Sequence, residues 1–244
     1  MAERRKFYTS FHDLSPREYM YIPEGTLKVG RPGSFSRIEL GHLFIAIAVL
    51  TVAFSFTFSQ NSVLFYLLGY PINLVSYFVF MPVAFLGIVT AFFVHELAHK
   101  FVAQRYGLWS EFRMYPRALL VSVMLAFVTG IVVAAPGAVM FRGHTRSFET
   151  GRIAVAGPSA NIAITIVTYV LYRFITVKGE LVTTVLGFVC LVNALLATFN
   201  LLPFGPLDGK KVVEWNGIVW CVLFSISAVF LGFLLSIGIS LPGF

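Results

Sequence analysis

The sequence has few charged residues and very little cysteine. Asp, Glu, Lys and Arg make up only 12% of the 244 residues, whereas a soluble domain carries about 25%. The mean hydropathy is +0.84. Cys190 and Cys221 both lie in apolar runs, so no disulfide framework is expected. These shortages exclude an ordinary water-soluble domain and predict a polytopic integral membrane protein embedded in the lipid bilayer.

Long polar segments are also scarce. Residues 1–39 form the one sizeable polar stretch, and no apolar run closely follows the basic residues at positions 4–6. We therefore expect no cleavable signal peptide. The predicted organisation is a polar tail over 1–39 and a transmembrane domain over 40–244, with a functional core at about 77–211. The net charge of +7 lies mainly at the ends of apolar runs, which indicates membrane orientation and no nucleic-acid partner.

Apolar runs of spanning length predict an all-α fold with five to six transmembrane helices. A shorter run, 63–76, contains the turn signal Gly69-Tyr70-Pro71 and predicts an interfacial or re-entrant segment. The clear spans are Gly41–Ser59, Tyr77–Tyr106, Ile153–Phe174, Leu181–Leu202 and Ile218–Ile239.

The stretch from Ala118 to Phe141 has two interpretations. Hydropathy alone favours a further span. Basic clusters precede it at residues 100–117 and follow it at 142–152 and 210–211, and positive charge concentrates on the cytoplasmic side. A single crossing would place the later clusters outside. We therefore expect a membrane re-entrant hairpin, of β type, that returns to the same side. The N-terminus and the opening of the active site are then cytoplasmic, and Lys178 lies outside.

The segment His95-Glu96-Leu97-Ala98-His99 continues an apolar run. Histidines four residues apart lie on one helix face, where both imidazoles can bind one zinc ion. Glu96 can then act as the general base toward a zinc-activated water. The alternative is a pair of buried histidines bonded to the backbone. Polar groups at membrane depth are costly, which favours the functional interpretation.

A catalytic zinc usually has three protein ligands, and Asp208 is the best candidate for the third. It follows a segment broken by Pro203, Gly205 and Pro206, where helix geometry fails and a side chain can turn inward. The same break would leave backbone groups near Pro203 free to hold a substrate strand. The alternative for Asp208 is a helix cap.

Three motifs occur in an order that resembles the site-2 protease family of intramembrane zinc metalloproteases. They are His95-Glu96-x-x-His99, Gly157-Pro158-Ser159-Ala160-Asn161 and Asn200 with the run Pro203 to Gly209. The resemblance implies one Zn²⁺ per chain, bound by His95, His99 and Asp208, with Glu96 as the catalytic base. It further implies that Asn200 orients substrate or stabilises the oxyanion, and it assigns Asn161 to substrate contact. The chain is similar to compact members that lack a PDZ or CBS domain.

The predicted function is therefore zinc-dependent endoproteolysis within the membrane. The expected partners are single-span membrane proteins, held extended beside the hairpin near Gly137 and Ala138. A prenyl-protein type of membrane protease would take its third ligand from a glutamate, for which Glu111 and Glu149 are the candidates. A zinc transporter or a catalytically inactive adaptor are the non-enzymatic alternatives.

Overall fold

The chain folds into a bundle of long apolar helices with one small sheet. The computed structural model describes residues 33–132, 136–142, 145–174 and 180–237. Within these residues, five helical segments are long and apolar enough to cross a membrane, which confirms the predicted fold class. They are Arg37–Leu67, Leu74–Arg105, Ser147–Phe174, Leu181–Asn200 and Gly217–Ser236.

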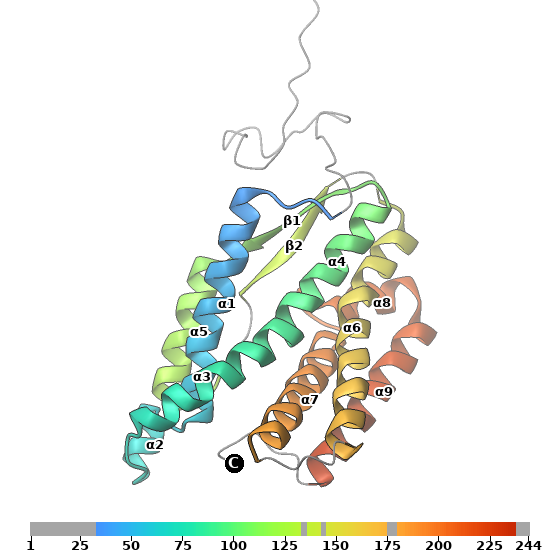
Figure 1. Cartoon of the computed structure of the whole chain (residues 1–244). Helices are drawn as coiled ribbons and strands as arrows, with labels where there is room; N and C mark the ends of the chain where they lie inside the picture. The colour runs from blue at the N-terminus through green and yellow to red at the C-terminus, as the bar shows by residue number, and fades with distance from the viewer. Residues whose placement is uncertain (1–32, 133–135, 143–144, 175–179, 238–244) are drawn as a thin grey trace, which may run out of the picture.

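The described elements follow one another in a simple order (Figure 1). The first four helical elements are α1 (Arg37–Phe58), α2 (Val63–Leu67), α3 (Leu74–Ile88) and the π-helical turn η3 (Val89–Phe93). They are followed by α4 (Val94–Arg105), β1 (Trp109–Met114), α5 (Pro116–Thr129) and β2 (Gly137–Arg142). The last elements are α6 (Ser147–Phe174), α7 (Glu180–Asn200), α8 (Asp208–Trp215) and α9 (Gly217–Ser236).

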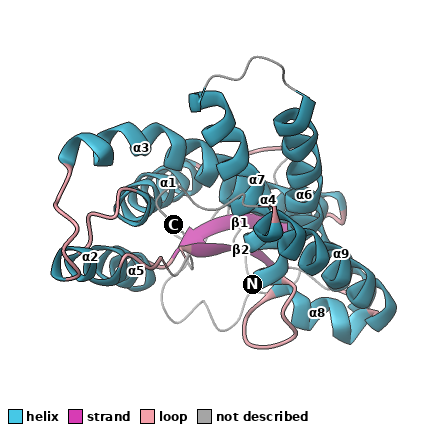
Figure 2. Cartoon of the chain, turned by 90° about the horizontal axis from the view of Figure 1, so that it is seen from below, coloured by secondary structure: helices cyan, strands magenta, loops and turns pink. Residues whose placement is uncertain are grey.

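The sheet lies near one end of the bundle (Figure 1), between two groups of helices. Figure 2 shows α1, α2, α3 and α5 to one side of it and α6, α7, α8 and α9 to the other. Both strands contact α4, and β1 also contacts α1. Phe112 of β1 packs with Leu43 and Leu50 of α1 and with Phe92 of η3 in one buried apolar cluster. This packing fixes the sheet against the helix that carries the two histidines.

The helix with the zinc motif is the continuation of a membrane span. α3, η3 and α4 succeed one another without a break, and the π-helical turn ends immediately before Val94 and His95. A π-turn changes the angular position of all later side chains relative to a regular α-helix, and such turns are frequent at functional sites. The Thr90 hydroxyl donates to the Leu86 carbonyl at 2.8 Å and to the Gly87 carbonyl at 3.1 Å, which ties the widened turn to the preceding helix.

The predicted re-entrant hairpin returns as expected but contains a helix. β1 and β2 pair antiparallel, with Trp109 opposite Arg142 and Met114 opposite Gly137. The two ends of the stretch therefore lie at the same end of the bundle. Between the strands runs α5, whose 14 residues rise about 21 Å, less than the hydrocarbon thickness of a bilayer. Hydropathy alone could not separate this short helix from a full span.

The first transmembrane helix begins earlier than predicted. α1 starts at Arg37 after the N-cap Ser36, whose side chain accepts a hydrogen bond from the Glu39 amide. Glu39 is fully buried, so it belongs to the bundle and not to a solvated polar tail. The reason is the Lys100 ammonium of α4, which lies 2.8 and 2.6 Å from its two carboxylate oxygens. The rest of the predicted tail, residues 1–32, lies outside the described residues.

The described basic side chains predict which positions face the same side of the membrane. Arg105, at the end of α4, and Arg146, just before α6, are both exposed and lie at one end of the bundle, whereas Tyr70 lies between α2 and α3 at the other (Figure 1). In a Cys221→Ser background, Arg105→Cys and Arg146→Cys should react with an impermeant thiol reagent from the cytoplasmic side, and Tyr70→Cys from the outside. Labelling of Arg105→Cys and Arg146→Cys from opposite sides would contradict the return between β1 and β2.

Candidate metal centre

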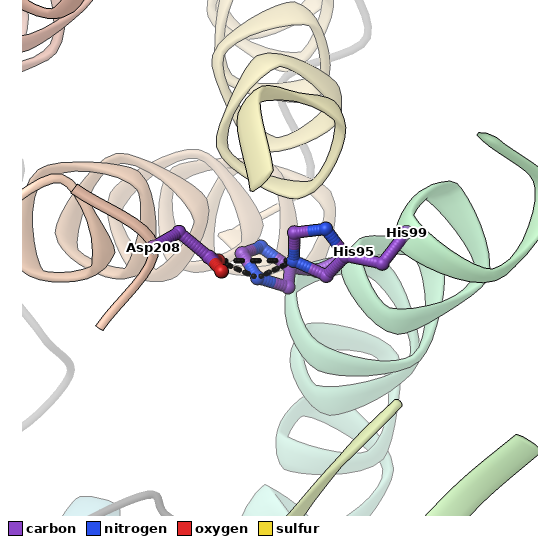
Figure 3. A group of neighbouring side chains, drawn as sticks. All are labelled: His95, His99 and Asp208. Carbon is purple, nitrogen blue, oxygen red and sulfur yellow. Dashed lines mark hydrogen bonds and ion pairs between the residues drawn. The ribbon is translucent and has the colours of Figure 1, made fainter. Parts of the chain in front are cut away.

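Two histidines of α4 face one another across a single helical turn. His95 and His99 are four residues apart, so their side chains lie on the same helix face, and both are buried. Their Nε2 atoms are 3.0 Å apart. Figure 3 shows both imidazoles directed toward the carboxylate of Asp208. The spacing in the sequence is thus realised as a pair of converging nitrogen atoms.

Asp208 reaches the histidines from a different helix. α7 ends at Asn200, the next residues form a series of turns, and Asp208 is the first residue of α8. Its Oδ2 lies 3.3 Å from His95 Nε2 and 3.0 Å from His99 Nε2. One oxygen of this carboxyl group therefore meets both imidazoles.

The hydrogen bond at Nδ1 of each imidazole determines which ring nitrogen can bind a metal ion. His99 Nδ1 lies 2.7 Å from the Ile153 carbonyl oxygen, and His95 Nδ1 lies 3.0 Å from Asn161 Oδ1. Both partners only accept, so each Nδ1 carries a proton. The Asn161 amide cannot be turned round, because its Nδ2 donates to the Ala91 carbonyl at 3.0 Å. The Nε2 atom of each histidine therefore carries the lone pair that can bind a cation. The hydrogen bonds at Nδ1 fix the orientation of both rings.

The three converging atoms fit a tetrahedral zinc site. Ligands about 2.0–2.1 Å from zinc lie about 3.3 Å from one another in a tetrahedron, close to the observed 3.0–3.3 Å. Two neutral imidazole nitrogens and one carboxylate form a known donor set for catalytic zinc. In the described parts of the chain, no other group of three or more His, Cys, Asp or Glu side chains converges in this way.

Gly157 of α6 leaves the space that the imidazoles occupy. A Cβ atom at this position would overlap His99 Nε2 and His95 Nε2. Gly157 lies inside the 28-residue helix α6, which continues through Pro158. Glycine is required here because α6 packs directly against the imidazoles of the candidate ligands His95 and His99.

Asn161 makes contacts that the sequence did not suggest. Its side chain is fully buried, its amide oxygen meets His95 of α4, and its amide nitrogen donates to the Ala91 carbonyl of η3. Asn161 is absent from the lining of the cavity, and its contact with substrate stays a prediction. A polar residue one turn after Gly157 was visible in the sequence. Its partner was not, because only the packing of α6 on α4 brings the two together.

A cavity of about 440 Å³ adjoins the three candidate ligands and Glu96. Glu96 lies one residue from His95 and is nearly buried, and its Oε2 accepts a hydrogen bond from the Val139 amide of β2 at 2.9 Å. Of the other residues predicted from the sequence, Asn200, Gly137 and Ala138 line the cavity, whereas Pro203 does not and is exposed. Asn200 Nδ2 donates to the Leu196 carbonyl at 3.0 Å, and the same amide group has a second N–H to offer.

Two residues at the cavity were not anticipated. Val139 contributes its amide to Glu96, a contact that no side-chain pattern could reveal. Lys211 lines the cavity and its ammonium lies 3.5 Å from Asp208 Oδ1, although the sequence suggested only a charge that orients the chain. The spacing of three between Asp208 and Lys211 at the start of an amphipathic helix was the available signal.

The glutamates considered as alternative third ligands lie elsewhere. Glu111 is buried on β1, where its carboxylate pairs with Arg113. Burial raises the pKa of Glu111, and Arg113 counteracts this effect. Glu149 accepts a hydrogen bond from the Arg146 amide at 2.8 Å. Neither belongs to the group formed by His95, His99 and Asp208, which removes the structural basis for the prenyl-protein type of site.

Comparison with curated proteins identifies relatives of this chain. A Methanocaldococcus jannaschii protein named "Putative zinc metalloprotease MJ0611" is 34% identical over 190 residues, which cover 78% of this chain and 90% of the relative. "Putative zinc metalloprotease YwhC" of Bacillus subtilis is 28% identical over 167 residues, 60% of this chain and 72% of the relative. "Putative zinc metalloprotease Rip3" of Mycobacterium tuberculosis is 31% identical over 173 residues, 68% of this chain and 39% of the relative.

These relatives define the class of the protein as a zinc metalloprotease with several membrane-spanning helices. Within that class, the chain belongs to the site-2 protease family, as its three motifs implied. No family model matches the chain, and no solved structure gives a significant match.

Removal of the carboxylate ligand should remove the metal. We expect the purified protein to contain about one zinc ion per chain, and Asp208→Ala to lose most of it, because two imidazoles alone leave the site without its charged ligand. Elemental analysis after dialysis against a weak chelator measures this directly. Glu214→Ala, an exposed change on the same helix α8, is the control. Full zinc content together with intact activity in Asp208→Ala would refute the assignment.

Asn161 should act on the metal through His95. Asn161→Ala removes the acceptor that fixes the His95 ring, and loss of such an outer hydrogen bond typically weakens metal binding by about 10- to 100-fold. Asn193→Ala is the matched control, because Asn193 is equally buried but bonds to Thr90 and Val189. Both variants should be less stable, and only Asn161→Ala should bind zinc more weakly. Equal zinc affinity in the two variants would assign Asn161 to packing alone.

Proposed function

We propose that this metalloprotease is an intramembrane endopeptidase, which hydrolyses peptide bonds in or near transmembrane segments of other membrane proteins. The observation that carries the proposal is the position of the three candidate ligands and Glu96. These side chains are buried beside a cavity within a bundle of five apolar helices of membrane-spanning length. Polar and ionisable side chains in such a bundle are expensive to bury and mark functional sites.

The proposed roles follow from the positions of the side chains. When bound by His95, His99 and Asp208, zinc supplies a Lewis acid that polarises the peptide carbonyl and lowers the pKa of water toward about 7. Glu96 takes the proton from the attacking water and transfers it to the leaving amine. The Val139 amide holds one oxygen of that carboxylate, so the other oxygen can face the water. The second N–H of Asn200 can stabilise the developing oxyanion.

The free edge of β2 is the proposed binding site for the substrate backbone. The Phe112 amide donates to Glu39 and the opposite Val139 amide donates to Glu96, so this pair of residues does not exchange hydrogen bonds across the sheet. Backbone groups of Gly137, Val139 and Phe141 therefore point away from β1 and toward the cavity that these residues line. A substrate segment must leave its helical conformation to be cleaved, and an extended segment can pair with such an edge.

The proposed orientation places the basic end of the bundle in the cytoplasm. Arg37, Arg105, Arg146 and Arg152 are exposed in the structure at this end, and positive charge is concentrated on the cytoplasmic side of membrane proteins. Lys178 lies outside the described residues. Lys211, at the cavity, is 42% exposed in its side chain, which supports access for water from the same side.

The non-enzymatic alternatives find less support. A zinc transporter requires a polar pathway from one side of the membrane to the other. α9, for example, contains no charged residue, and apart from three serines its side chains are apolar. An inactive adaptor has no need of a general base, yet Glu96 lies beside the candidate ligands and is held by Val139. Both alternatives predict that no peptide bond is cleaved.

Cleavage of a membrane-embedded test substrate is the decisive measurement. The purified protein should cleave members of a panel of single-span substrates that carry helix-weakening residues, and a zinc chelator should abolish the reaction. Glu96→Gln keeps the shape of the side chain and its bond to Val139 but cannot accept a proton, so turnover should fall by about 100-fold or more with zinc content unchanged. Glu214→Gln, an exposed glutamate, should cleave normally. Near-normal turnover in Glu96→Gln would require a different base.

A further inference from the structure

A buried ion pair connects the first transmembrane helix to the helix that carries the metal ligands. Lys100, the residue after His99, places its ammonium 2.8 Å from Glu39 Oε1 and 2.6 Å from Oε2. The side chains are only 1% and 0% exposed. The ammonium also lies over the Phe35 ring, 4.5 Å from its centroid. Replacing a buried ion pair by apolar residues often costs no stability, so the pair calls for an explanation other than stability.

The pair satisfies the outer edge of the small sheet. Glu39 Oε1 accepts a hydrogen bond from the Phe112 amide at 2.9 Å, and Lys100 donates to the Ser110 carbonyl at 3.1 Å. Both backbone groups point away from β2, because Phe112 and Ser110 are two residues apart on one strand. Glu39 and Lys100 thus provide the acceptor and the donor that a third strand would provide. They leave β2 as the strand whose edge can accept a partner.

The opposite edge of the sheet is attached to the same helix. The Val139 amide of β2 donates to Glu96, and Glu96 and Lys100 are four residues apart on α4. Residues with this spacing share a helix face. α4 therefore presents two adjacent rows of polar side chains. His95 and His99 converge on Asp208, while Glu96 and Lys100 hold the two edges of the sheet.

We infer that Glu39 and Lys100 are positioning residues. They hold β1 and β2 in a fixed position relative to His95, His99 and Asp208. The inference rests on the proposed function, because the quantity that the pair controls is the place of the substrate-binding edge of β2 relative to His95, His99 and Asp208. It assigns a role in substrate binding to two residues that do not line the cavity.

The test uses variants that remove both charges together, because a single change would leave one unpaired buried charge. Glu39→Leu/Lys100→Met replaces the pair by apolar side chains and leaves the Phe112 amide and the Ser110 carbonyl without partners. Glu39→Gln/Lys100→Gln is also uncharged but can still accept from Phe112 and donate to Ser110. Arg105→Met, an exposed change on the same helix, is the control for loss of a positive charge.

Two measurements on the zinc-loaded full chain are required. The first is the cleavage of a single-span substrate, with kcat and KM expressed per zinc-loaded molecule. The second is hydrogen–deuterium exchange of the 109–114 and 137–142 segments, which reports on the sheet independently of activity. In Glu39→Leu/Lys100→Met, KM should rise about tenfold, the size expected for the loss of one or two backbone hydrogen bonds. The Phe112 and Val139 amides should exchange faster by about the same factor, while α4 remains protected and zinc content is unchanged.

Recovery in the Gln/Gln variant separates positioning from bulk stability. KM and amide exchange in this variant should lie closer to the wild-type values, and Arg105→Met should match the wild type. Unchanged KM and unchanged exchange in Glu39→Leu/Lys100→Met would overturn the inference, as would equal defects in both double variants. If Glu39→Leu/Lys100→Met does not bind zinc, Glu39→Gln/Lys100→Met is compared with the Gln/Gln variant in the same way. Failure of the wild type to cleave any substrate would refute the proposed function instead, and exchange would still decide whether the pair holds the sheet.

Discussion

The arrangement of the site depends on polar side chains buried on one stretch of α4. Burial of an imidazole, a carboxylate or an ammonium is costly unless each polar atom finds a partner. His95 and His99 find theirs in Asp208, Asn161 and the Ile153 carbonyl. Each partner comes from a different position in the chain. The requirement to satisfy these two imidazoles therefore fixes where α6 and α8 must lie relative to α4.

The same requirement determines the local features of the surrounding helices. α6 can approach the imidazoles only because position 157 has no Cβ atom. α8 can begin beside them only because the chain after Asn200 turns before a new helix starts at Asp208. Gly209 fits close to the Leu201 carbonyl at this turn, where a Cβ atom would overlap it. The prolines and glycines of this segment are thus needed to place the Asp208 carboxylate beside the two imidazoles. The break between α7 and α8 in this way becomes part of the candidate metal centre.

The sequence predicted those parts of the site that are encoded locally. The spacing of His95, Glu96 and His99 defines a helix face without any knowledge of the fold, and Asp208 was found because few other acidic residues lie near membrane depth. Glu39 was not found, since its partner Lys100 is 61 residues away and the polar residues around it resemble a solvated tail. Asn161 was recognised as a candidate, but its contact with His95 was not predicted, because only the packing of α4 on α6 brings the two side chains together. The helix inside the predicted hairpin was missed, because hydropathy measures how apolar a segment is and not whether it crosses.

The two edges of the sheet find hydrogen-bond partners in two different ways. An open strand edge exposes amide and carbonyl groups that lipid cannot satisfy. On β1, these groups meet the side chains of Glu39 and Lys100, so the edge is closed within the protein. On β2, the edge borders a cavity, and the Val139 amide bonds to Glu96. Water must reach this cavity if a peptide bond is to be hydrolysed there, and the same water can satisfy the remaining edge groups until an extended substrate replaces it. On the proposed function, the strand that binds substrate and the carboxylate that activates water therefore need the same wet space. This explains why the free edge lies beside Glu96 and the closed edge lies against α1.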